Sequence, residues 1–119
     1  MKFACNLVKS LEGTLTLIHV VVLPASNMPI DAARFEEAGK SVLETAQKLV
    51  QENGCKADTI LEMDIGNAGR KIVGVAQAQG FTLIVIHARG HSKFATLLMG
   101  SVCDAVAHNS PCPVLIVRP

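Results

Sequence analysis

The 119-residue chain contains no tryptophan and no tyrosine, and only four phenylalanines. Proteins that hold single-stranded nucleic acids stack the bases on aromatic side chains, so that mode of binding is not expected. A charge excess of one sign is also missing, because 11 lysines and arginines stand against 10 aspartates and glutamates. Nucleic-acid-binding surfaces carry a clear basic excess. We therefore expect no nucleic-acid partner, and a core built from valine, leucine, isoleucine and alanine.

Long apolar runs are absent as well. A membrane-spanning helix needs about 20 apolar residues, and His19 and Pro24 interrupt the longest apolar neighbourhood. Residues 1–6 are not followed by the apolar segment of a signal peptide. We expect a cytoplasmic protein with no membrane association. No C-x-x-C pair occurs, which predicts reduced and chemically inert cysteines at all four positions: Cys5, Cys55, Cys103 and Cys112.

Apolar runs alternate with helical spacings along the chain. The patterns predict strands at residues 14–22, 58–65, 81–86 and 114–117, and helices at residues 3–11, 31–53, 68–79 and 101–109. Asp31 is suited to begin a helix, and Gly54 and Gly80 are suited to end one. Alternating strands and helices predict a single α/β domain with a parallel sheet. On the long helix, the apolar spacing predicts a buried face of Phe35, Ala38, Val42, Ala46 and Leu49.

The segment after residue 86 carries the strongest functional signal. Gly90 follows an apolar run, and Gly100 and Ser101 open the next predicted helix. Glycine lets the backbone turn and approach a ligand, and a helix start offers unpaired N–H groups and a positive dipole end to an anion. This pattern predicts a phosphate site. A Gly-Ser pair is also an ordinary helix start, so shaping of the turn alone is the alternative.

This segment, with Ser110-Pro111-Cys112-Pro113 and the apolar residues that follow, resembles the universal stress protein family. That family carries G-x2-G-x9-G-[S/T] after its fourth strand. Here Gly90, a nine-residue spacer, Gly100 and Ser101 match the pattern, whereas His87 stands at the first glycine. The resemblance implies one domain over residues 1–119, in which helices cover both faces of a parallel sheet.

The resemblance also implies a function. Family members of this kind are cytosolic stress-response proteins that bind ATP or AMP, with or without Mg²⁺, and act through dimerisation. The residues implied at the nucleotide are Val21, Ile86, His87, Arg89, Gly90, Gly100, Ser101 and Val102. The residues implied at a homodimer interface are those of the last strand, Val114, Leu115, Ile116 and Val117. A dimeric interaction module that binds no nucleotide is the alternative, and a slow ATPase is a weaker one.

Two departures from the family bear on nucleotide binding. The family has a strand before its first helix, in the middle of the sheet, which ends in an aspartate facing the nucleotide. This chain starts within the helix that follows, and a missing central strand leaves costly unpaired backbone groups. Either the two halves close into one sheet, or a partner supplies a strand, or Met1 is an internal start of a longer protein. At His87, the side chain either obstructs the ligand or donates a hydrogen bond to phosphate.

Catalytic and metal-binding patterns are not evident. The glycine loop lacks the lysine of G-x-x-x-x-G-K, and no Ser-His-Asp arrangement can be argued from spacing. His87 and His91 lie four residues apart, but in a predicted loop with no third ligand nearby. We therefore expect neither enzymatic activity nor a metal site.

Overall fold

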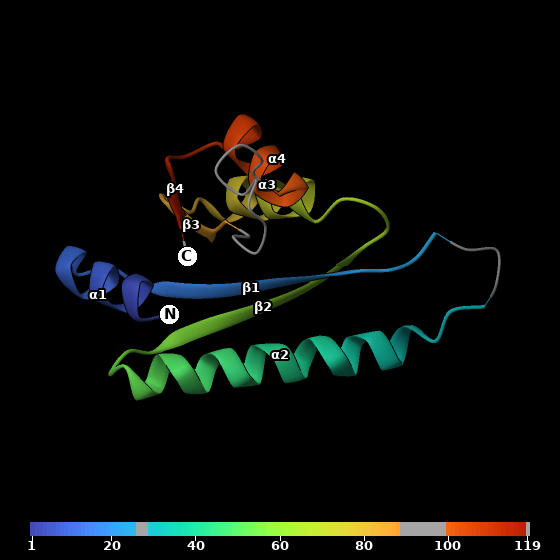
Figure 1. Cartoon of the computed structure of the whole chain (residues 1–119), viewed down its shortest axis with the longest axis horizontal. Helices are drawn as coiled ribbons and strands as arrows, with labels where there is room; N and C mark the ends of the chain where they lie inside the picture. Colours follow the sequence, from blue (N-terminus) through green and yellow to red (C-terminus); the bar gives the residue numbers. More distant parts are fainter. Residues whose placement is uncertain (26–28, 89–99, 119) are drawn as a thin grey trace. The chain divides into compact units, whose positions relative to one another are not determined.

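The computed structural model describes residues 1–25, 29–88 and 100–118. The chain divides into two compact units, the N-terminal unit (Met1–Gly66) and the C-terminal unit (Asn67–Pro119). In the described residues of each unit, two helices alternate with two parallel strands (Figure 1). The predicted α/β class is therefore confirmed.

In the N-terminal unit, a long helix crosses over between two parallel strands and lies along both of them (Figure 1). Gly39 of this helix permits the close approach, because a Cβ atom there would lie 2.6 Å from Val21 Cγ2 and 2.8 Å from Leu61 Cδ1. A larger residue would push the helix away from the sheet. The elements of this unit are α1 (Lys2–Leu11), β1 (Leu15–Val22), α2 (Ala32–Glu52) and β2 (Ala57–Asp64).

The buried face of α2 differs from the predicted one. Gly39, Leu43 and Val50 are the buried residues of the helix. Val42 and Leu49, which were expected inside, are 50% and 43% exposed. The buried residues and the predicted ones form two rows along the helix, each with helical spacing. The two rows lie side by side on the helix surface. The row that contains glycine faces the sheet, because it allows the closer approach of the two backbones.

Both glycines that were predicted to end helices do so in the structure. Gly54 and Gly80 have φ values of 75° and 69°, as expected for residues that end helices in the left-handed conformation. Asp31 is the N-cap of α2, although its side chain makes no capping hydrogen bond. At the end of α1, Glu12 takes the left-handed conformation (φ 53°) in place of the neighbouring Gly13.

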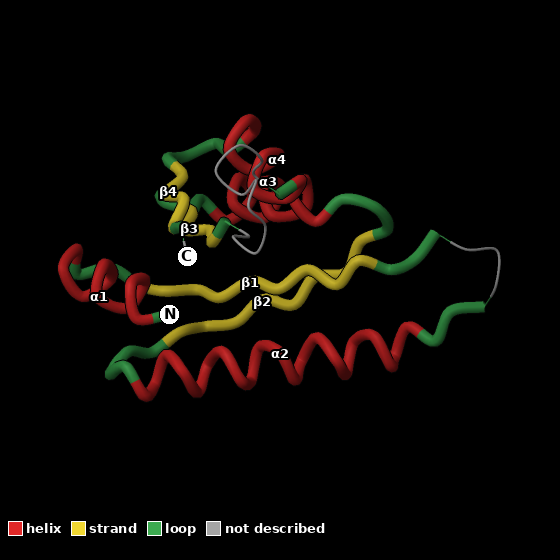
Figure 2. Tube along the Cα trace, viewed as in Figure 1, coloured by secondary structure: helices red, strands yellow, loops and turns green. Residues whose placement is uncertain are grey.

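In the C-terminal unit, two helices pack closely against each other (Figure 2). Their contact is tight at Gly69, where a Cβ atom would lie 2.7 Å from Ala105 Cβ and 3.1 Å from the Val102 carbonyl oxygen. The elements are α3 (Ala68–Gln79), β3 (Ile84–His87), α4 (Ser101–Asn109) and β4 (Val114–Val117). The buried apolar side chains of this unit are Ala76, Cys103 and Val106.

The described strands pair within their own units, and the expectation of one sheet with helices on both faces stays a prediction. β1 pairs with β2, and β3 pairs with β4, as two separate two-stranded parallel sheets.

Candidate functional site

The start of α4 has the geometry of an anion site. Gly100 is its N-cap, with φ −60° and ψ 157°, and its carbonyl oxygen accepts the Asp104 N–H at 2.9 Å. As a glycine, Gly100 has no side chain that could cap this end. Ser101 is exposed and Val102 is half-buried. The first N–H groups of a helix have no partner within the helix, and the helix dipole is positive at that end. Negative charge is therefore favoured beside Gly100 and Ser101.

Ile86 and His87 lie at the carboxyl end of β3, in the same unit as the start of α4. In a β–α–β crossover the helix starts beyond the carboxyl end of the first strand, which is where ligands bind in parallel α/β folds. The topology therefore brings the β3 end and the Gly100–Ser101 pair to one side of the unit. Arg89 and Gly90, which were predicted to complete this site, lie outside the described residues.

The conformation of His87 bears on whether its side chain obstructs a ligand or donates a hydrogen bond to phosphate. Glu12 is the one non-glycine residue with positive φ in the described ranges, so His87 has no left-handed backbone strain. Its ring is exposed, and Nδ1 lies 3.0 Å from the Ala88 carbonyl oxygen. Since a carbonyl oxygen only accepts, Nδ1 carries a proton. A second N–H, at Nε2, is then available to an anion when the ring is protonated.

Val21, the remaining predicted site residue, belongs to the N-terminal unit. Its Cγ2 atom packs beneath α2 at Gly39. Side chains alternate along a strand, so Val22 points to the opposite face, and it is 44% exposed. The structure thus places Val21 in the helix–sheet packing of its own unit, and its contact with a nucleotide remains a prediction.

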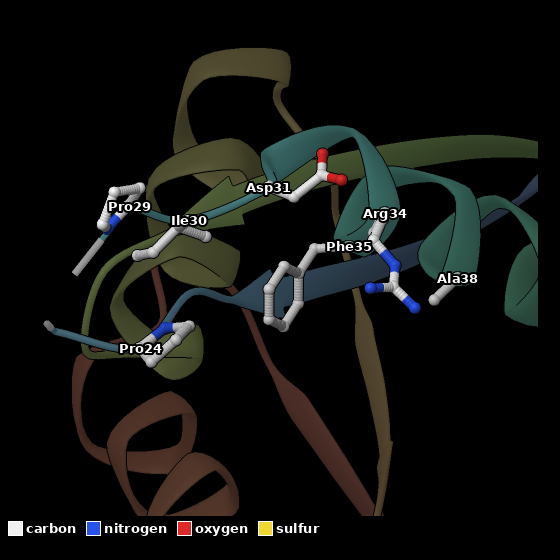
Figure 3. Close-up of a pocket in the computed structure, with 7 residues that line it drawn as sticks. All are labelled: Pro24, Pro29, Ile30, Asp31, Arg34, Phe35 and Ala38. Atoms are coloured by element: carbon white, nitrogen blue, oxygen red, sulfur yellow. The ribbon is translucent and has the colours of Figure 1, made fainter.

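A groove beyond the carboxyl end of β1 was not predicted. It encloses about 630 Å³ between the segment that follows β1 and the start of α2 (Figure 3). That volume is typical of small-molecule sites. Five of its seven lining residues are apolar, and the two charged ones lie at the start of α2, Asp31 as the N-cap and Arg34 in the first turn. The lining residues are Pro24, Pro29, Ile30, Asp31, Arg34, Phe35 and Ala38.

Two sequence signals could have indicated this groove. Pro24 and Pro29 bracket the loop between β1 and α2, and proline restricts the backbone on both sides of that loop. Asp31, Arg34 and Phe35 follow at the helix start, where charged and apolar side chains are brought together.

Cys103 is directed away from solvent although it lies in the first turn of α4. Burial raises the pKa of the Cys103 thiol, and the negative charge of Asp104 raises it further. A thiol with a raised pKa is mostly protonated near neutral pH and is a poor nucleophile. Asp104 itself is exposed, with its carboxylate 3.2 Å from His108 Nε2. The α4 start thus offers hydrogen-bond donors and no reactive thiolate.

Two further kinds of site are absent from the described residues. The residues seen in the structure include no group of three or more His, Cys, Asp or Glu side chains arranged to hold a metal ion. In the same part of the chain, no helix is both long and apolar enough to cross a bilayer.

Comparison with known proteins decides the family. Residues 1–118 match the Universal stress protein family. The chain belongs to the universal stress protein family. Universal stress protein YxiE of Bacillus subtilis is 33% identical over 97% of this chain and 86% of its own length. Universal stress protein MJ0531 of Methanocaldococcus jannaschii is 32% identical over 98% of this chain and 72% of its own length.

Solved universal stress protein structures confirm the fold. The universal stress protein of Archaeoglobus fulgidus superposes with a TM-score of 0.76 at 22% identity, over 97% of this chain and 78% of that one. A structure of the universal stress protein from the same organism in complex with dAMP has a TM-score of 0.70, also at 22% identity, over 97% of this chain and 82% of that one.

Proposed function

We propose that this universal stress protein binds an adenine nucleotide, ATP or AMP, with the phosphates at the start of α4. The observation that carries the proposal is the helix start at Gly100, whose N-cap residue has no side chain and beside which Ser101 is exposed. Backbone N–H groups and a positive dipole end favour phosphate there. The complex of the Archaeoglobus fulgidus relative with dAMP supports adenine nucleotides as the ligand class.

The proposal also covers the rest of the glycine motif, the role of the protein and Mg²⁺. His87 replaces the first glycine of the motif, and Arg89 and Gly90 contribute to the phosphate site. The protein acts as a cytoplasmic stress-response protein, by binding and without catalysis. Mg²⁺ accompanies ATP in the way that it does in other phosphate sites, through the phosphate oxygens.

Replacing His87, at the carboxyl end of β3, tests whether this residue contributes to the phosphate site. We propose that its ring, held by Ala88, donates from Nε2 to a phosphate oxygen. His87→Gly is then expected to weaken AMP and ATP binding by about tenfold, since a hydrogen bond to a charged group contributes roughly 1.5–3 kcal/mol. Calorimetric titration of wild type and variant measures this difference. Tighter binding by the variant would show instead that the side chain obstructs the ligand.

We also propose that β4 forms the homodimer interface. The Ile84 N–H donates to the Pro113 oxygen at 3.0 Å, and the Ala88 N–H donates to the Val117 oxygen at 2.9 Å. The backbone N–H and C=O groups of successive strand residues point to opposite edges of the strand. Those of Leu115 and Val117 therefore point toward β3, and those of Val114 and Ile116 point toward the other edge. That edge carries apolar residues and has no neighbouring strand among the described residues. An uncovered apolar edge favours pairing with a second copy.

Proline substitutions distinguish the two edges of β4. Ile116→Pro removes an N–H that points away from β3, so it is expected to convert the dimer to a monomer with little change in melting temperature. The matched change Val117→Pro removes an N–H on the β3 side and is expected to destabilise the fold. Sedimentation velocity and thermal unfolding measure both effects. A dimer that persists in Ile116→Pro would place the interface elsewhere.

A further inference from the structure

The end of α1 is anchored to the turn between α2 and β2. The Lys9 ammonium group donates to the Asn53 carbonyl oxygen at 2.8 Å. One helical turn earlier on the same face of α1 lies Cys5, which is fully buried, with 0% of its surface exposed. Its Sγ lies 4.0 Å from the Val50 carbonyl oxygen, near the end of α2. Cys5 therefore faces the same turn as Lys9.

Cys55 lies in that turn. Its backbone N–H donates to the same Val50 carbonyl oxygen at 3.1 Å. Unlike Cys5, it is only half-buried. Burial raises the pKa of the Cys5 thiol, and hydrogen bonding with the adjacent Cys55 thiol raises it further. The Cys5 thiol and the Cys55 backbone N–H, from positions 50 residues apart in the sequence, thus meet at one carbonyl oxygen.

We propose that Cys5 and Cys55 are an oxidisable pair, which a peroxide converts to an intramolecular disulfide between α1 and the α2–β2 turn. The half-buried Cys55 reacts first. Its thiolate attacks one peroxide oxygen, the O–O bond breaks, and Cys55 sulfenic acid and hydroxide form. Cys5 then attacks the sulfenic sulfur, the S–O bond breaks, and hydroxide leaves as the S–S bond forms. For hydrogen peroxide, two thiols and one peroxide give one disulfide and two waters.

The burial pattern assigns the two roles. Cys5 has no exposed surface through which a peroxide could reach it, whereas Cys55 is partly open to solvent. The raised pKa keeps Cys5 mostly protonated near neutral pH, so the second step is slow there and becomes faster as pH rises. The disulfide would close a loop that includes all of β1 and α2. Such a covalent closure restricts the unfolded chain and stabilises the folded one.

Treatment of the purified full chain with hydrogen peroxide tests the proposal. We expect loss of two of the four thiols that a thiol reagent titrates, and a peptide map that links Cys5 to Cys55. The melting temperature should rise on oxidation and return to its first value after reduction with dithiothreitol. Disulfide formation should be faster at pH 9 than at pH 7, as expected for a resolving thiol whose pKa is raised.

Two variants serve as controls. Cys55→Ser removes the half-buried member and is expected to abolish both the cross-link and the rise in melting temperature. Cys112→Ser removes another half-buried cysteine, in the C-terminal unit, and should leave both unchanged. The proposal is overturned if all four thiols remain titratable after peroxide treatment. It is equally overturned if the link involves Cys103 or Cys112, or if Cys55 is oxidised to sulfinic acid while Cys5 stays a thiol.

Discussion

Gly100→Asp is expected to weaken AMP and ATP binding by more than about tenfold while leaving the fold intact. Its φ of −60° is open to any residue, so the substitution introduces no backbone strain. Aspartate is a preferred N-cap, whose carboxylate accepts the same helix N–H groups that we assign to phosphate. Its negative charge also repels the phosphate, and a like-charge contact costs several kcal/mol. Calorimetric titration measures the affinity, and thermal unfolding measures the stability.

Gly100→Asn separates charge from capping in this experiment. Asparagine also caps a helix, but it is neutral, so it competes for the N–H groups without repelling the ligand. The expected order of affinity is wild type, then Gly100→Asn, then Gly100→Asp, with melting temperatures equal to or slightly above that of wild type. Unchanged affinity in Gly100→Asp would mean that the nucleotide does not lie at the start of α4.

Gly69→Ala is expected to lower the free energy of unfolding by up to about 2 kcal/mol, because overpacking usually costs about 1–3 kcal/mol. The new methyl group would lie 2.7 Å from Ala105 Cβ and 3.1 Å from the Val102 carbonyl oxygen. Neither atom can move by a side-chain rotation, so α3 and α4 must separate. This cost exceeds the roughly 0.5–1 kcal/mol that alanine gains over glycine within a helix. Urea unfolding of wild type and variant measures the difference.

Gly74→Ala, in the same helix, is the matched control. A Cβ atom at Gly74 meets nothing within 4 Å, so only the helix preference acts. We expect this variant to be more stable than wild type by roughly 0.5–1 kcal/mol. If both substitutions stabilise the protein equally, the close packing of α3 on α4 at Gly69 is not present in solution.

Local signals in the sequence predicted most of the secondary structure. Helix α3 and helix α4 agree with the predicted residues 68–79 and 101–109, because glycines and a Gly-Ser start mark their ends. Strand β3 was predicted at residues 81–86 but spans Ile84–His87. Its hydrogen-bonded partner determines the start: the Ile84 N–H donates to the Pro113 oxygen, just before β4 begins. The apolar residues before Ile84 have the composition of a strand but lie before this pairing.

Long-range packing was not predictable from local signals. Which of two adjacent apolar rows on α2 faces the sheet depends on the fit of Gly39 against Val21 and Leu61, from both strands. Cys5 and Cys55 both contact the Val50 carbonyl oxygen because α1 packs on the end of α2, a contact between residues far apart in the sequence. Pairing of the strands as two sheets likewise depends on which neighbours are present.

The candidate site was predicted in part. The motif spacing identified Gly100 and Ser101, and the structure places them at an uncapped helix start. It also indicated Ile86 and His87, which lie at the carboxyl end of β3. The anchoring of the His87 ring by the Ala88 oxygen could not be foreseen, because it depends on the side-chain rotamer. The groove near Phe35 was missed, although its lining residues all lie within residues 24–38, because it depends on how the segment after β1 lies beside the start of α2.

An NMR titration of the ¹⁵N-labelled chain with AMP tests the central claim most directly. The backbone N–H groups of Ser101 and Val102 are the donors that we assign to phosphate, so their amide resonances should shift furthest and reach saturation. Inorganic phosphate should shift the same amides at higher concentration, because it lacks the adenosine contacts. If millimolar AMP leaves these amides unshifted, or shifts only resonances away from the start of α4, the proposed nucleotide site is wrong.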